Sequence, residues 1–482
     1  MFLGLLPAPF MTWTIAASTV AAMFVRPRRI PEAIWACLGA GLLLAFHLVP
    51  FPEALGAVTK GYDVYLFLTG MMVLAELARR EGVFDWLAGI AMRAAAGSRA
   101  KLFALIYLVG IVVTTVLSND ATAVVLTPAV YAVMKRAKGD PLPYLFACAF
   151  IANAASFVLP ISNPANLVMF GNNLPPLLPW LRIFLLPAGA AILATYLTMR
   201  LLFRRTLQGE VPKPSILEDL RLSTAGKLTV LGVIAIAGVL LVCSATGKSL
   251  GLPTCITALA ITLFITLWDR QAPLVVGRGV SWSVLPLVAG LFVIVDALDS
   301  AGGLQLARNL LDKLTEWPPL AANLTTAFGF AVVSNLINNL PVGLIGASAL
   351  QASVGSGHLA NAMLMGIDLG PNLSVTGSLA TILWLIALRR ENLQVSAWSF
   401  LKVGAIVMPV ALLLAGLFLW FTSPQKEHYP KEPKRSATNL CQIIAERVPP
   451  NDSGKYHRIP LMQGRARRKV PPRTDPCLPR LS

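Results

Sequence analysis

Polar side chains interrupt apolar sequence at four places in this chain, within residues 118–122, 162–166, 338–339 and 368–378. Pro and Gly in these breaks end helices, while Asn, Ser and Thr offer hydrogen-bond donors and acceptors without a permanent charge. Such a lining suits a small neutral solute that carries several hydroxyl groups. The candidate substrate-binding residues are Ser118, Asn119, Thr122, Asn163, Asn166, Asn338, Asn339, Thr376, Gly377 and Ser378. The alternative role of the Asn side chains is to satisfy backbone groups where a helix is broken.

Two carboxylates, Asp120 and Asp368, lie in these breaks. An ionised carboxyl is costly in hydrocarbon, so burial favours the protonated form and makes proton uptake at neutral pH feasible. We therefore predict that Asp120 and Asp368 carry protons. The alternative is a structural aspartate that caps the N-terminus of a half-helix, where the helix dipole favours the anion.

No other pattern indicates catalysis or a metal. The six cysteines are scattered singly, and no short Cys/His spacing is typical of zinc or of a disulfide framework. We expect no metal site and no cofactor. Glu76 and Asp296 lie near the ends of apolar segments, so we assign both to the membrane interface.

Composition places the chain in a membrane: 56% of its residues are apolar and 13% are charged, where a soluble protein has roughly 25% charged residues. Apolar stretches recur that are long enough to cross a hydrocarbon core of ~30 Å. In a membrane protein, basic loops record topology, so the net charge of +17 does not indicate nucleic-acid binding. The candidate spans are about 4–25, 31–51, 62–78, 144–168, 177–203, 228–246, 252–269, 283–299, 358–388 and 399–421.

Residues 103–134 are the exception among the apolar segments, because basic residues flank both ends. The positive-inside rule places both flanks in the cytoplasm. The arms 103–117 and 121–134 are each too short for a comfortable span. We therefore predict a re-entrant helical hairpin with its tip at Ser118-Asn119-Asp120, since broken backbone at this depth must line a protein cavity.

The chain also contains an internal repeat at an offset of about 220 residues. Gly70 aligns with Gly290, and Gly82 with Gly302; Ser118-Asn119-Asp120 aligns with Ile337-Asn338-Asn339 at an offset of 219. Asn153 aligns with Asp368, and 162–166 with 377–381, at an offset of 215. The flanking charges give the two halves opposite orientations, as in inverted-repeat transporters.

The repeat predicts the domain organisation of an all-α polytopic protein with about ten spans and two re-entrant hairpins. Residues 1–203 form the first repeat, with its hairpin at about 103–134, and 228–421 the second, with its hairpin at about 320–350. Residues 204–227 form a cytoplasmic linker. Residues 422–482 form a basic tail rich in Pro, for which we expect disorder.

The hairpin tips and the last break resemble one known family. Ser118-Asn119-Asp120-Ala121-Thr122 resembles the first hairpin of the arsenical pump membrane proteins, the arsenite and antimonite efflux pumps, and Asn338-Asn339-Leu340-Pro341 resembles their second. The most specific match is Asp368-Leu369-Gly370-Pro371-Asn372 with the segment from Thr376 to Trp384. The resemblance covers roughly residues 10–420.

This resemblance implies the ion transporter superfamily, with a transport domain that carries two hairpins beside a scaffold domain. It also implies export of arsenite and antimonite as neutral trihydroxides in exchange for protons, across a bacterial inner (plasma) membrane. The partners are then a small metalloid solute, protons and membrane lipid, and no nucleic acid. A homodimer and a separate soluble ATPase subunit remain open.

Two rival functions follow from the same residues. One is a sodium/proton or small-anion exchanger of the same superfamily; the tips carry no Lys or Arg, which disfavours an anion. The remote rival is an intramembrane aspartyl hydrolase that uses Asp120 and Asp368 as a carboxylate pair. We expect a transporter and not an enzyme.

Overall fold

A computed structural model describes residues 7–25, 30–171, 174–210, 221–302, 304–352 and 359–422. These residues form helices joined by turns and short irregular segments, with one isolated β-bridge between Ser98 and Glu210 and no strand in the described ranges. The predicted tail beyond Thr422 lies outside the described residues, as does 211–220 of the predicted linker.

Helices of the first half surround two breaks. Their bounds are α1 Ala8–Val25, α2 Glu32–Ala45, α3 Phe51–Lys60, α4 Tyr62–Arg80, α5 Val83–Ala94, α6 Arg99–Val116, α7 Asn119–Ala121, the π-helical turn η3 Thr122–Leu126, α8 Thr127–Arg136, α9 Leu142–Ala154, α10 Pro164–Phe170 and α11 Leu177–Leu202.

The remaining helices form the second half of the chain. Their bounds are α12 Thr224–Ala245, α13 Gly251–Trp268, α14 Leu274–Gly279, α15 Val284–Ser300, α16 Gln305–Thr315, α17 Pro319–Ile337, α18 Asn339–Ala352, α19 Leu359–Leu369, the 3-10 turn η7 Gly370–Asn372, α20 Leu379–Arg390 and α21 Ala397–Thr422.

All ten predicted spans coincide with a helix or a broken pair of helices. Two of them are broken: α9 and α10 replace 144–168, and α19 and α20 replace 358–388. We expected breaks in the two longest, 177–203 and 358–388; this is right for 358–388 and wrong for 177–203, which is the single helix α11. Within the described residues, six helices are long and apolar enough to cross a membrane, or seven if the bent pair α3–α4 counts as one span. The fold class is confirmed: the chain is an all-α polytopic membrane protein.

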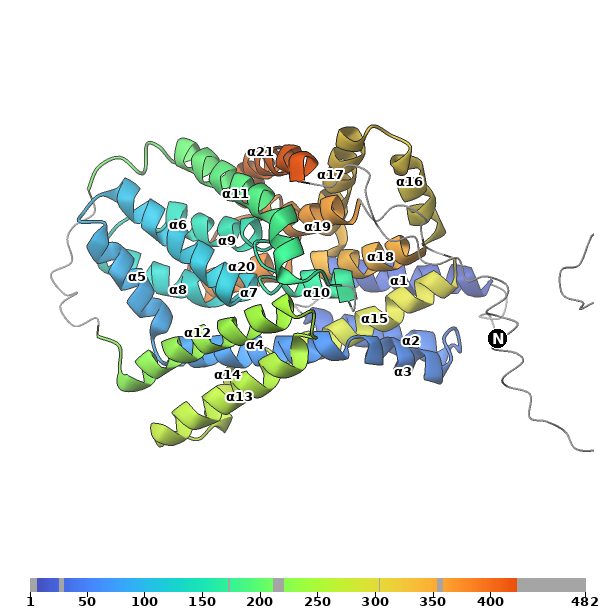
Figure 1. Cartoon of the computed structure of the whole chain (residues 1–482), viewed down its shortest axis with the longest axis horizontal. Coiled ribbons are helices and arrows are strands. Elements are labelled where there is room, and N and C mark those ends of the chain that lie inside the picture. The colour runs from blue at the N-terminus through green and yellow to red at the C-terminus, as the bar shows by residue number, and fades with distance from the viewer. Residues whose placement is uncertain are drawn as a thin grey trace, which may run out of the picture. The chain divides into compact units, whose positions relative to one another are not determined.

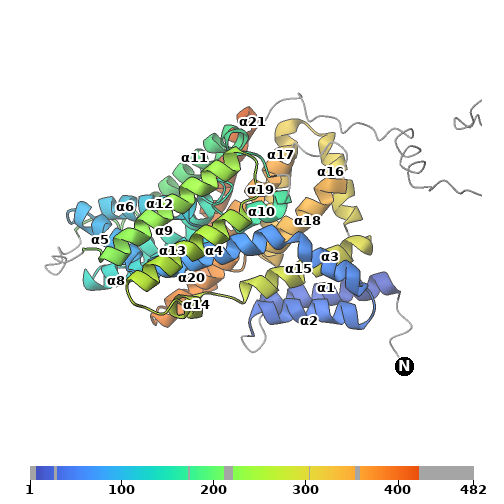
Figure 2. The same ribbon diagram turned by 60° about the horizontal axis from the view of Figure 1, so that its bottom comes forward.

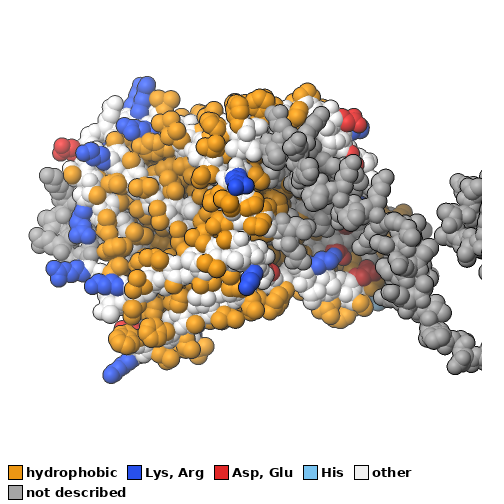
Figure 3. All heavy atoms as spheres, in the orientation of Figure 1, with side chains coloured by type: hydrophobic (Ala, Val, Ile, Leu, Met, Phe, Trp, Pro, Cys, Tyr) orange, Lys and Arg blue, Asp and Glu red, His pale blue; other side chains and the backbone are white. Residues whose placement is uncertain are grey.

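The described surface fits a lipid environment. Figure 3 shows hydrophobic side chains over most of the visible described surface, with Lys and Arg gathered toward its left edge. Large apolar side chains of the long helices face outward, among them Leu193 and Leu197 of α11 and Ile234 of α12. In a soluble protein such a surface would promote aggregation, whereas in lipid it lies against acyl chains.

Helices that the repeat relates make equivalent contacts. α4 packs along α13, and its repeat partner α15 packs along α2 (Figure 2). A glycine lies at each contact: a Cβ on Gly70 would lie 2.8 Å from the Thr254 carbonyl oxygen, and one on Gly290 would lie 2.8 Å from that of Ala36. Gly82 and Gly302, the second aligned pair, both have left-handed backbone, with φ of 70° and 73°.

At each predicted hairpin tip, one helix ends and another begins, and the arms are longer than predicted. That these segments re-enter the membrane stays a prediction. α6 has 18 residues and is one of the six candidate spans. The argument that the arms are too short to span was therefore wrong, since α6 is long enough to cross a membrane. Figure 1 shows α6 and α8 both reaching the edge where α5 lies, and α17 and α18 in the opposite part of this unit.

Candidate substrate pathway

Each hairpin tip is held by the broken helix that follows it. The Asn119 backbone N–H donates to the Ser162 carbonyl oxygen at 3.0 Å, and the Asn339 N–H donates to the Gly377 carbonyl oxygen at 2.9 Å. These bonds make Asn119 equivalent to Asn339, at an offset of 220. The alignment of Asp120 with Asn339 was therefore wrong by one residue, because the first tip has two residues between its helices and the second has one.

In the first tip, most polar atoms bond to the protein. The Ser118 hydroxyl accepts from the Ala121 N–H at 3.1 Å, and the Asn119 Oδ1 accepts from the Asp120 N–H at 2.9 Å. The Thr122 hydroxyl lies 2.8 Å from that of Thr114, and both are fully buried. Asn119 and Thr122 thus stabilise the tip itself.

In the second tip, Asn338 reverses the chain with φ of 76°. This left-handed conformation favours Gly and Asn. The Asn338 Oδ1 accepts from the Leu340 N–H at 3.3 Å. The Thr376 hydroxyl donates to the Asn335 carbonyl oxygen at 3.2 Å. A Cβ on Gly377 would lie 2.7 Å from the Asn335 Oδ1, so this position has no room for a side chain.

The two broken helices, α9–α10 and α19–α20, are joined by two hydrogen-bond contacts between repeat-related residues. Asn163 begins α10 by accepting from the Ala165 N–H, and its Nδ2 donates to the Asp368 Oδ1 at 2.8 Å. Its repeat partner Ser378 begins α20, and its hydroxyl lies 3.5 Å from the Oδ1 of Asn153, the repeat partner of Asp368. Each half therefore contributes one helix N-terminus and one polar residue from the preceding helix.

Asp368 and Asn166 each keep one unsatisfied oxygen in the interior. Asp368 is fully buried, and its Oδ2 has no hydrogen-bond partner among the described residues. Asn166 donates to the Ser156 and Leu159 carbonyl oxygens at 3.0 and 3.3 Å, while its Oδ1 is also without a partner there. Unsatisfied buried oxygens of this kind need an explanation, such as a bound proton or solute.

A cavity of about 80 Å³, which we call the Asp120 cavity, lies against the first tip. It has room for several water-sized groups. Its polar lining side chains are Glu76 from α4, Ser118 and Asp120 from the tip, and Ser281 from the segment before α15; its other lining residues are apolar or glycine. The Asp120 carboxylate has no hydrogen-bond or ion-pair partner within the described ranges.

A smaller cavity of about 30 Å³ lies against the second tip. Asn338 and Thr376 line it, opposite Val20, Met23 and Glu32 of the first half. Each tip thus faces a cavity of its own. Asp368 lines neither of these two, so the structure does not bring Asp120 and Asp368 together in the Asp120 cavity.

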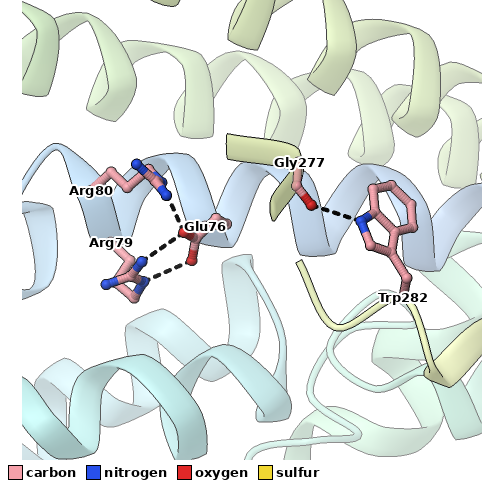
Figure 4. Close-up of polar contacts among 5 residues, drawn as sticks. All are labelled: Glu76, Arg79, Arg80, Gly277 and Trp282. Carbon is pink, nitrogen blue, oxygen red and sulfur yellow. Dashed lines mark hydrogen bonds and ion pairs between the residues drawn. The ribbon is translucent and has the colours of Figure 1, made fainter. Parts of the chain in front are cut away.

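Glu76 has a contact that the sequence did not indicate. It is 5% exposed and lines the Asp120 cavity, while its assignment to the membrane interface stays a prediction. Both oxygens accept from Arg79, at 2.6 and 2.7 Å, and Oε1 also accepts from Arg80 at 2.9 Å (Figure 4). Asp296, the other carboxylate assigned to the interface, pairs with Lys60 at 2.6 Å with its side chain 27% exposed.

Several polar residues near the breaks were not singled out. The Asn153 Nδ2 donates to the Asn372 Oδ1 at 2.9 Å, and the Asn335 Nδ2 donates to the Gly370 carbonyl oxygen at 2.7 Å. The signal for Asn153 was present in its alignment with Asp368. No local signal distinguished Asn335, which lies inside α17.

Comparison with known proteins identifies relatives along most of the chain. A family model described as "Citrate transporter" matches residues 20–370. The arsenical pump membrane protein of Escherichia coli strain K12 is 29% identical over 432 residues, which cover 84% of this chain and 97% of that protein. That of Yersinia enterocolitica is 29% identical over 425 residues, with 84% and 96% covered.

A solved structure has a similar fold. It is the Alcanivorax borkumensis YdaH transporter, described as having an unusual topology, with a TM-score of 0.50, 13% sequence identity, and coverage of 78% of this chain and 89% of that one. The predicted resemblance to arsenical pumps is confirmed by the named relatives. The chain is therefore a multi-pass inner-membrane transporter and belongs to the family that the citrate-transporter model describes, with arsenical pump membrane proteins among its relatives.

Proposed function

We propose that this transporter exports arsenite and antimonite as neutral trihydroxides in exchange for protons. One observation carries the proposal: the Asp120 cavity holds a carboxylate with no charged partner beside the Ser118 hydroxyl, in a lining without Lys or Arg. A carboxyl in such a place is able to gain and lose a proton, and hydroxyl groups are able to bind an uncharged trihydroxide. The arsenical-pump relatives favour this substrate class.

The site residues divide into two roles. Ser118, Asn338 and Thr376 line a cavity and are the candidates for direct contact with the solute. Asn119, Thr122, Asn163, Asn166, Asn339, Gly377 and Ser378 hold the broken backbone in place. Asp120 binds and releases the exchanged proton at the Asp120 cavity. Asp368 is the second proton-binding residue, and it lies where the two broken helices contact each other.

Replacement of Asp120 by Asn tests the proposal. We expect Asp120→Asn to lower proton-driven arsenite uptake into everted membrane vesicles by roughly tenfold or more, because the amide cannot exchange the proton. Asp269→Asn, at an exposed position just after α13, is the matched control and should transport normally. Normal uptake by Asp120→Asn would remove this carboxyl from the mechanism.

A small-anion or sodium/proton exchanger is the second candidate, because the matching family model is described as a citrate transporter. The lining of the Asp120 cavity disfavours an anion, since it offers carboxylates and no cation. Proton-driven uptake of citrate, or sodium-dependent proton movement, in the same vesicles without any arsenite transport would favour this candidate.

A further inference from the structure

Glu76 lines the Asp120 cavity, whereas the two arginines that it binds do not. Arg79 and Arg80 both donate to the Glu76 carboxylate, and neither is among the residues that line the cavity. The Arg79 side chain is 48% exposed and that of Arg80 is 27% exposed, against 6% for Glu76. Both guanidinium groups are therefore more exposed than the buried carboxylate that they share.

The C-terminal end of α14 packs on this carboxylate. The backbone of Gly279 packs directly on Glu76, so that a Cβ on Gly279 would overlap the Glu76 Oε1. The Trp282 Nε1 donates to the Gly277 carbonyl oxygen at 2.6 Å and closes the turn (Figure 4). A Cβ on Gly277 would meet nothing within 4 Å. The fit on Glu76 is therefore specific to Gly279.

Guanidinium groups are the side chains best suited to bind carboxylate anions, because their paired N–H groups match two carboxylate oxygens. Arg79 already makes this two-point contact with Glu76. An anion in the cavity would have to compete with Glu76 for the arginines. It would also face like-charge repulsion from Glu76 and Asp120, which both line the cavity.

We propose that Glu76 determines the charge specificity of the pathway: by binding Arg79 and Arg80 it prevents them from binding carboxylate anions at the Asp120 cavity, which is left to uncharged solutes. This inference rests on the proposed function, since it assigns the neutrality of the solute to one side chain. Loss of the Glu76 charge should convert the cavity into an anion site.

Citrate is the probe, and its binding is measured by titration calorimetry on the purified full-length protein in detergent. The variants are the wild type, Glu76→Gln, and Glu76→Gln combined with Arg79→Gln and Arg80→Gln. We expect Glu76→Gln to bind citrate roughly tenfold more tightly than the wild type or better, because one charge-assisted contact has about this effect. The triple variant should return to wild-type binding, since it has no free arginine.

A second pair of variants keeps every charge in place. Gly279→Ala displaces the Glu76 carboxylate and should also strengthen citrate binding, whereas Gly277→Ala should bind as the wild type does. This pair decides the question if Glu76→Gln does not fold. Tight citrate binding by the wild type or the triple variant would overturn the inference, as would weak binding by both Glu76→Gln and Gly279→Ala. If the wild type does not transport arsenite but the variants bind citrate as expected, the proposed function is wrong and the role of Glu76 still holds.

Discussion

At the scale of single residues, Asp368 combines complete burial with incomplete hydrogen bonding. Its Oδ1 accepts from Asn163, and its Oδ2 has no partner among the residues that the structure describes. A carboxyl that carries a proton on Oδ2 would be neutral, which lowers the cost of burial. The same group is then able to release its proton when the surroundings change.

Two substitutions separate the structural role of Asp368 from its proposed proton role. Asp368→Ala leaves the Asn163 amide without its acceptor, so we expect a loss of about 1–3 kcal/mol of stability. Asp368→Asn keeps an oxygen that accepts from Asn163, so its stability should change less while proton-driven uptake is lost.

Thermal unfolding in detergent measures the first effect, and arsenite uptake into everted vesicles measures the second. If Asp368→Ala unfolds at the same temperature as the wild type, the hydrogen bond to Asn163 does not contribute to stability. Normal uptake by Asp368→Asn would leave Asp120 as the sole proton carrier of the proposal.

At the scale of helices, the repeat depends on close backbone contacts. Gly70 places α4 against the backbone of α13 at Thr254, and Gly290 places α15 against that of α2 at Ala36. Backbone is less able to move aside than the end of a flexible side chain. These two glycines are therefore equivalent in packing as well as in sequence.

We expect Gly70→Ala and Gly290→Ala each to destabilise the protein by about 1–3 kcal/mol, because the methyl group pushes two helices apart. Gly189→Ala in α11 is the control, since a Cβ there meets nothing within 4 Å. It should be neutral or stabilising by up to about 1 kcal/mol. Unfolding temperatures in detergent give the comparison, and equal values for all three variants would contradict the packing argument.

The helix bounds were largely predictable, and the site was predictable only in part. Apolar length and flanking charges predicted α11 and α21 to within two residues at each end. The breaks were predictable because Pro, Gly and Asn are rare together in apolar sequence. The cavity position of Glu76 was not predicted, because its place near the end of α4 says nothing about a cavity lined by the α7 tip, the end of α14 and the residues that follow it.

At the scale of the whole described unit, the equivalent hydrogen bonds at the breaks relate its two halves. The bond from Asn163 to Asp368 and the contact between Ser378 and Asn153 join residues of opposite halves. Such cross-contacts form only if the halves are folded against each other. The inverted arrangement predicts that the two hairpins enter from opposite faces of the membrane.

Cysteine labelling tests this orientation. In a background without the native cysteines, Arg136→Cys at the end of α8 and Glu316→Cys just after α16 place exposed thiols beside the two hairpins. A membrane-impermeant maleimide added to intact cells should label the residue 316 thiol, and in everted vesicles the residue 136 thiol. Labelling of both thiols from the same side would contradict opposite entry.

The sequence by itself determined the membrane class, the spans, the positions of the four breaks and the repeat, because all of these depend on local apolar length and local helix breakers. Only the tertiary structure decided which polar atoms face a cavity. Ser118 and Asp120 do, whereas the neighbouring Asn119 and Thr122 bond to the protein. That division depends on contacts between residues far apart in sequence, such as Asn163 with Asp368, 205 residues away. Local patterns carry no information on such contacts.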